Sequence, residues 1–149
     1  MGISLGATLV SAQNLDVIKQ RRETMRAVAA ASAPNFKMMK GDLPFDLKAA
    51  QTNLQTMQEQ LAKFKDLFPD NSKTGGDTDA SPKIWTARND FNTALEKMLA
   101  EVKNAAAAIK DEASLKTEYM KVAQACGTCH KSEDGFAPNL SVSFKKPKP

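Results

Sequence analysis

Residues 47–68, LKAAQTNLQTMQEQLAKFKDLF, decide the fold that this sequence predicts. Apolar side chains recur within them at spacings of three and four residues, at Leu47, Ala50, Leu54, Met57, Leu61 and Phe64. This period places the apolar side chains on one face of an α-helix, as in the seam of a helical bundle. Pro69 ends the pattern, because proline lacks the backbone donor that a helix needs. A helix with one apolar stripe needs other elements to cover that stripe.

An earlier stretch predicts a first helix that begins after Asn14 or Asp16 and runs at least to Ala31. Its apolar stripe consists of Leu15, Ile18, Met25 and Val28. Pro34 predicts a break or kink near Ala33, followed by a short continuation of the helix.

Two further helices are expected after the long polar linker 70–81. One starts at Ser81-Pro82, a capping residue followed by proline at the first helical position, and buries a stripe at Ile84, Phe91, Leu95, Met98, Val102, Ala105 and Ile109. The last helix is capped by Asp111 or Ser114 and carries Leu115, Tyr119, Val122 and Cys126 on one face. Met57, Met98 and Met120 are expected to fill gaps in the core. Together these helices predict an all-α, antiparallel up-down-up-down four-helix bundle over residues 13–132.

The two ends of the chain are expected to lie outside this bundle. Residues 1–12 are interpreted as the remnant of a secretory signal peptide, because the apolar segment 3–12 ends in Val10-Ser11-Ala12, the small-x-small pattern of a cleavage site before Gln13. Residues 133–149 are expected to form an irregular basic tail. No stretch approaches the length of a membrane span.

Composition argues against a nucleic-acid partner. The chain has 149 residues, which suits one domain, and a formal net charge of only +4. Aromatic residues make up 6% of the sequence, and no run of lysine and arginine exceeds two residues. A nucleic-acid-binding surface usually combines a stronger basic patch with aromatic side chains.

The motif that carries chemistry is Cys126-Gly127-Thr128-Cys129-His130, at the end of the last predicted helix. It contains the only cysteines and the only histidine of the chain. Cys-x-x-Cys-His is the pattern by which a c-type haem is attached. On a helix the two thiols lie one turn apart on one face, so both can reach the vinyl groups on one porphyrin edge. His130 then supplies an axial ligand to the iron.

Three other interpretations of this motif are weaker. A dithiol redox motif expects a strand-helix setting, and no strand-like alternation precedes Cys126. A structural zinc site needs four ligands, whereas these residues offer two thiolates and one imidazole. A disulfide between Cys126 and Cys129 would bridge one helical turn with poor geometry.

Several stretches, taken with this motif, resemble the cytochrome c′ superfamily of four-helix haem proteins. They are residues 18–25 (IKQRRETM), Lys40-Gly41 with Pro44-Phe45-Asp46, Leu67-Phe68-Pro69, and Ser81-Pro82-Lys83-Ile84-Trp85, so the resemblance covers about residues 15–130. After the haem histidine, members commonly carry an aromatic residue and then an arginine. Residues 131–136 (KSEDGF) have neither in register.

This resemblance implies one covalently attached haem c and a role for each site residue. Cys126 and Cys129 hold the haem as thioethers, and His130 is the proximal iron ligand. Met25 falls where the family places the residue that faces the distal side of the iron. Arg21, one turn earlier, matches an arginine that the family often sets beside a haem propionate. The resemblance also implies that a homodimer through the first two helices is an option.

Met25 decides between two functions that the family combines with one scaffold. A methionine ligand raises the haem potential and keeps the iron six-coordinate. We therefore expect a periplasmic monohaem c-type cytochrome that carries single electrons between redox partner proteins, with Met25 as sixth ligand. The alternative is a five-coordinate, high-spin cytochrome c′ that binds NO or CO. A third alternative is a helical interaction protein without haem. Enzymatic turnover is not expected, because the one histidine is committed to iron and leaves no acid-base pair.

Overall fold

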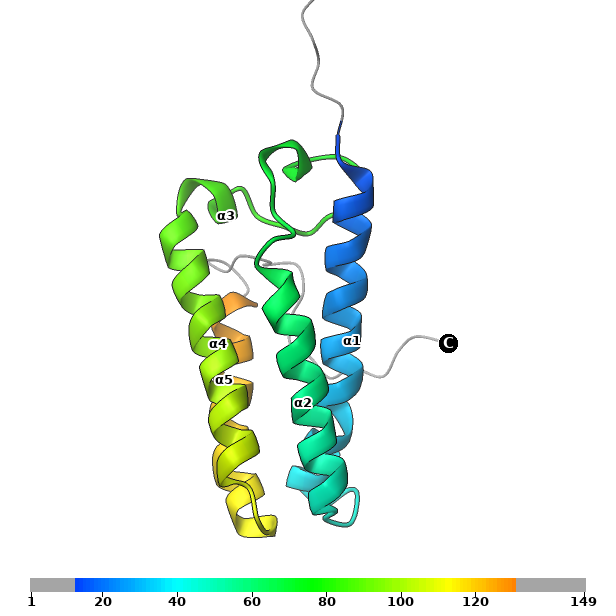
Figure 1. Ribbon diagram of the computed structural model, residues 1–149, viewed down its shortest axis with the longest axis vertical. Coiled ribbons are helices and arrows are strands. Elements are labelled where there is room, and N and C mark those ends of the chain that lie inside the picture. The colour runs from blue at the N-terminus through cyan, green and yellow to red at the C-terminus, as the bar shows by residue number, and fades with distance from the viewer. Residues whose placement is uncertain (1–12, 131–149) are drawn as a thin grey trace, which may run out of the picture.

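Four long helices run antiparallel in the computed structural model of the chain, which describes residues 13–130 (Figure 1). They are α1 (Leu15–Lys40), α2 (Leu47–Phe64), α4 (Arg88–Ala108) and α5 (Glu112–Cys129). A 3-10 helix, η1 (Asp70–Ser72), and a single-turn helix, α3 (Lys83–Thr86), lie between α2 and α4. Contacts join α1 to α2, α2 to α4, α4 to α5 and α5 to α1, which closes the ring. The predicted up-down-up-down bundle is confirmed.

The predictions for the chain ends lie outside the described residues. This applies to the signal-peptide remnant at 1–12, the tail at 133–149 and the atypical segment 131–136. Within residues 13–130, no helix is long and apolar enough to cross a membrane.

Side-chain caps fix where α1, α2 and α5 start. The Asn14 side chain accepts from the Val17 N–H at 3.2 Å, and the Asp46 side chain accepts from the Ala49 N–H at 2.9 Å. Asp111, not Ser114, is the cap of α5, and the two residues form a reciprocal capping box. At the other end of α1, Gly41 takes a left-handed φ of 80°, which glycine tolerates best.

The predicted apolar stripes form the core, except at Leu15 of the first stripe, which is 53% exposed. Leu54, Met57, Val102 and Leu115 have no exposed surface, and the whole predicted stripe from Ile84 to Ile109 is buried. Met120, which was expected to fill a gap in this core, is 48% exposed. It directly follows the buried Tyr119 and therefore points about 100° away from the buried face of α5. The expectation that Met120 fills the core is wrong.

Pro34 does not break α1, which continues through it to Lys40. Proline removes one helical hydrogen bond, but the residues beside it bind neighbouring helices. The Asn35 amide donates to the Ala50 carbonyl of α2 at 3.1 Å, and Ser32 is hydrogen-bonded to Tyr119 of α5. These tertiary bonds hold the segment helical, so the predicted break near Ala33 is wrong, and the alternative of a kink there stays a prediction.

A break occurs instead at Ala87, where one continuous helix was expected from Ser81-Pro82. Ala87 takes φ −124° and ψ 51°, and it separates α3 from α4. Trp85 and Arg88, on either side of it, both donate to the Phe68 carbonyl, at 3.2 and 2.7 Å. These two bonds to Phe68, just after α2, fix the break between α3 and α4.

Replacing Asn35 by alanine is expected to lower the free energy of unfolding by about 1–3 kcal/mol. Asn35 is completely buried, and its side chain both donates to Ala50 and accepts from the Asn53 amide at 2.9 Å. Chemical denaturation of the holoprotein measures the change. Asn104→Ala is the matched control, because Asn104 is exposed on α4. Equal stabilities for the two variants would contradict a role of Asn35 in joining α1 to α2.

Candidate haem site

The C-terminal turn of α5 presents the motif to the bundle interior. Cys126 and Cys129 are half-buried free thiols that pack against the hydrophobic core. Cys126 Sγ lies 3.9 Å from the Met98 Sδ atom of α4. His130 is the C-cap of the helix, and its backbone N–H donates to the Cys126 carbonyl at 3.2 Å. The Nδ1 atom of its ring is buried. Two inward thiols and an adjacent imidazole are the donor set that a covalently bound haem needs.

The electrostatics of the thiols argue against a redox dithiol. Burial raises the pKa of Cys126 to about 11, and the neighbouring Cys129 adds to this. Burial also raises the pKa of Cys129. Reactive Cys-x-x-Cys motifs depend instead on a lowered thiol pKa. Among residues 13–130, no three His, Cys, Asp or Glu side chains are grouped as metal ligands.

A pair of hydrogen bonds sets the register between α1 and α5. The Tyr119 hydroxyl donates to the Ser32 carbonyl at 2.9 Å, which leaves the Ser32 hydroxyl to donate back to Tyr119. Seven residues along a helix is about 10.5 Å and returns to nearly the same face. Because α1 and α5 are antiparallel (Figure 1), this step leads from Ser32 to Met25 and from Tyr119 to Cys126. Met25 therefore lies level with the start of the motif, and it is half-buried against the core.

Arg21 is 4% exposed, and its guanidinium binds the α2–α3 linker. It donates to the Ser72 hydroxyl at 3.1 Å, to the Ser72 carbonyl at 3.0 Å and to the Thr78 hydroxyl. The rings of Phe68 and Trp85 face it, with centroids at 5.1 and 5.7 Å. Burial lowers its pKa. No ion pair joins Arg21 to an acidic side chain within the described part of the chain, and only three of its five N–H donors are used in these bonds.

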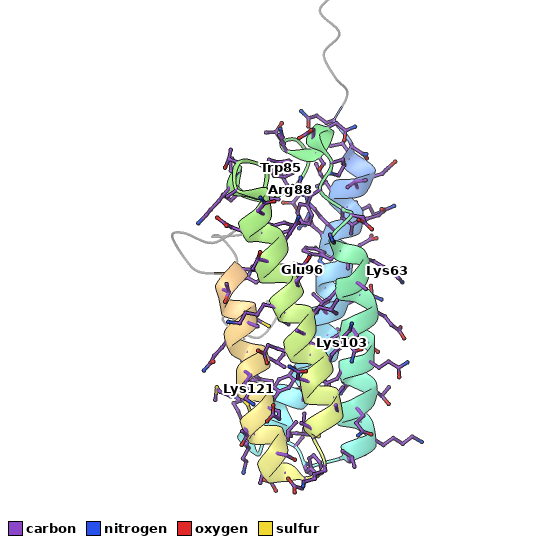
Figure 2. All side chains as sticks on the ribbon, turned by 60° about the vertical axis from the view of Figure 1, so that its left-hand side comes forward. Lys63, Trp85, Arg88, Glu96, Lys103 and Lys121 are labelled. Atoms are coloured by element: carbon purple, nitrogen blue, oxygen red, sulfur yellow. The ribbon has the colours of Figure 1, made fainter. Side chains whose placement is uncertain are left out.

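Sequence reasoning gave no role at this end of the bundle to Ser72 or Arg88. The Trp85 ring lies edge-to-face with Phe68 and under the Arg88 guanidinium, and Figure 2 shows Trp85 and Arg88 together where α4 begins. The fully buried Ser72 lies in a linker that looked like a surface loop. Of these residues, Phe68 and Trp85 belong to stretches on which the family resemblance rests. No sequence signal indicated Ser72, because a serine in a polar linker follows no apolar period.

The outer face of the bundle is charged. Figure 2 shows Lys63, Glu96, Lys103 and Lys121 directed away from the core, and all four are exposed. Charged side chains on the solvent-facing side are typical of amphipathic bundle helices and mark no site of their own.

One component of the pH dependence of stability follows from Tyr119, the only tyrosine of the chain. Burial raises its pKa above the usual value, only partly offset by the bond to Ser32. The unfolded chain ionises near pH 10 whereas the folded chain keeps the phenol neutral, so stability should fall as the pH rises above about 10. Phenolate absorbance during alkaline unfolding is the measurement. Tyr119→Phe should lose this component of the slope, and phenolate formation before unfolding would contradict the prediction.

Comparisons with known proteins agree on one relationship. A family model described as Cytochrome C' matches residues 16–132. Cytochrome c′ of Rhodopseudomonas palustris is 39% identical over 128 residues, 86% of this chain and 87% of that protein. Cytochrome c-555 of Bradyrhizobium diazoefficiens is 36% identical over 135 residues, 86% of this chain and 88% of that protein. The solved structure of the R. palustris cytochrome c′ superposes with a TM-score of 0.75, covering 80% of this chain and 94% of the other.

Proposed function

The chain belongs to the cytochrome c′ family, whose members carry one covalently attached haem c, and from this premise we propose that it is a periplasmic carrier of single electrons with Met25 as sixth iron ligand. When bound, the haem iron supplies the one-electron chemistry. The protein residues hold the group, orient it and keep water away from it. The carrier function and the ligand set are our proposal, whereas the class of monohaem c-type cytochrome follows from the family.

We assign the attachment to Cys126 and Cys129, whose thiols share the inner face of α5. His130, at the end of the same helix, supplies the proximal ligand. Arg21 is proposed to neutralise a haem propionate with the two N–H donors that its bonds to the linker leave over. A buried cation whose acceptors among residues 13–130 are all neutral favours such a counter-charge.

The single observation that carries the electron-transfer proposal is the register set by Ser32 and Tyr119. It supports Met25 as a residue that faces the motif from α1. A thioether sulfur is a soft ligand that binds both ferric and ferrous iron. A ligand that stays bound in both states leaves the site geometry nearly unchanged on electron transfer.

The alternative keeps Met25 as a packing residue and leaves the sixth position open to NO or CO. The similarity to a protein named cytochrome c′ supports it as directly as the similarity to cytochrome c-555 supports a carrier. The two functions differ in whether the Met25 sulfur is bonded to the iron, so a measurement of the iron coordination distinguishes them.

Redox proteins are the proposed partners, and the signal-like residues 1–12 are the basis for the periplasmic location. A homodimer through the outer faces of α1 and α2 stays a prediction, as does the absence of enzymatic turnover.

Optical spectra of the purified holoprotein test the proposal, in ferric and ferrous states, before and after CO and NO. Sharp low-spin ferrous bands, a weak ferric band from sulfur ligation and indifference to CO are expected. A broad high-spin ferrous spectrum that shifts at once with CO would select the gas-binding alternative.

A further inference from the structure

The linker 70–81, which we call the strap, is fastened to the first turns of α1. The Gln13 amide donates to the Thr74 hydroxyl at 2.9 Å, and the Asn14 N–H donates to the Asn71 carbonyl at 2.8 Å. Arg22 forms an exposed ion pair with Asp77. Every one of these contacts comes from residues 13–22, so the strap and the start of α1 form one unit.

The first turns of α1 depend on the strap for their burial. Ile18 is 2% exposed but lies outside the main core cluster, whose first member along the chain is Val28. A Cβ placed on Gly76 of the strap would lie 3.7 Å from the Ile18 Cγ2 atom. Gly76 of the strap therefore covers Ile18. The buried apolar side chains further along α1 are covered by the bundle core instead.

Arg21 makes the buried hydrogen bonds between α1 and the strap. Its bonds reach Ser72 in η1 and Thr78 near the end of the strap, so one guanidinium ties two points of the strap to α1. Ser72 is itself fixed, because its hydroxyl donates to the Pro69 carbonyl at 2.8 Å. Thr78 Oγ1 also accepts from the Ala80 N–H at 3.2 Å. Bonds between a buried cation and fixed acceptors are stronger than those of the exposed Arg22–Asp77 pair.

Met25 follows Arg21 by four residues and so lies one turn further along the same face of α1. A displacement of the turn at Arg21 is transmitted to Met25 by the intervening helical hydrogen bonds. On the other side, Val28 and the Ser32–Tyr119 bonds anchor α1 to the core. Met25 thus lies between a core anchor and the strap.

We propose that Ser72 and Thr78, acting through Arg21, are positioning residues that hold Met25 against the iron, and that loosening the strap lets Met25 leave and an external ligand enter. This inference rests on the proposed ligation by Met25. The strap would then control how fast the sixth coordination position of the iron becomes open. Arg21 itself keeps its proposed second role toward the propionate.

The test measures CO binding to the ferrous holoprotein by stopped flow in wild type, Ser72→Ala and Thr78→Val. Each variant removes one acceptor of the Arg21 guanidinium and leaves Met25 unchanged. The loss of one charge-assisted hydrogen bond should raise the rate of CO binding about tenfold. Hydrogen exchange of backbone amides in residues 15–22 and 70–81 should accelerate in the same variants.

Two controls separate positioning from general destabilisation. Asp77→Asn weakens the exposed pair on the same strap, and Asn35→Ala weakens the distant α1–α2 bond. Both should bind CO at the wild-type rate. Wild-type CO kinetics in Ser72→Ala and Thr78→Val, in a protein whose ferrous spectrum is low-spin, would overturn the positioning role while the proposed function stands. A high-spin wild-type spectrum would instead overturn the ligation and the positioning role with it.

Discussion

Replacing Met25 by leucine is expected to convert a low-spin ferrous protein that ignores CO into a high-spin one that binds CO and NO on mixing. Leucine fills nearly the same volume as methionine but offers no sulfur lone pair to the iron. The substitution should therefore cost less than about 1.5 kcal/mol in stability while the coordination changes completely. Optical spectra of both oxidation states, with and without CO, measure the effect.

Met57→Leu and Met98→Leu serve as controls for the loss of a methionine as such. Both residues are buried, Met57 beside Tyr119 and Met98 beside Cys126. Their spectra should match the wild type. Identical spectra for Met25→Leu and wild type would show that Met25 only packs in the bundle.

Covalent attachment should be lost completely when Cys126 and Cys129 are both replaced by alanine. Each single variant should keep the haem through one thioether, because the two thiols lie on the same inner face of α5 and reach different vinyl groups. Mass spectrometry of the denatured protein, after expression with haem-attachment machinery, detects the adduct. Thr128→Ala is the matched control, since Thr128 is exposed within the same motif and its hydroxyl donates to the Gln124 carbonyl of its own helix. A haem adduct on the double variant would contradict attachment at this motif.

The parts of the fold that follow a helical period could be predicted from the sequence. Residues 47–64 carry one unbroken apolar stripe, and the caps at Asn14 and Asp111 have side chains that are favoured at a helix start. The motif at 126–130 needed no structure to be recognised, because its chemistry is local. These features depend on neighbours within about one turn of each other, which is the range that sequence patterns report.

The errors concern positions where distant contacts outweigh local preference. Pro34 predicts a break, yet bonds from Ser32 and Asn35 to other helices keep α1 continuous. Ala87 carries no signal for a break, and the bonds of Trp85 and Arg88 to Phe68 produce one. Tertiary interactions override intrinsic propensity in both directions.

The site shows the same division. Spacing placed Met25 and Arg21 on one face of α1, and the Ser32–Tyr119 register agrees with Met25 lying level with Cys126. The partners of Arg21 could not be read from the sequence, because Ser72 is 51 residues away and lies in a polar linker. The propionate contact of Arg21 stays a prediction beside these observed bonds.

The contact of Cys126 with Met98 bears on the order in which the molecule is assembled. A thioether forms when a thiol meets a porphyrin vinyl group, and in the closed bundle the Cys126 thiol is half-buried, protonated at neutral pH and 3.9 Å from another sulfur. In the open chain the thiol is exposed and clear of Met98, and its pKa returns to the usual value of about 8.5, so a larger fraction of it is thiolate. The helices then pack around a haem that is already attached. A chain whose helices pack before attachment must open again before Cys126 can react.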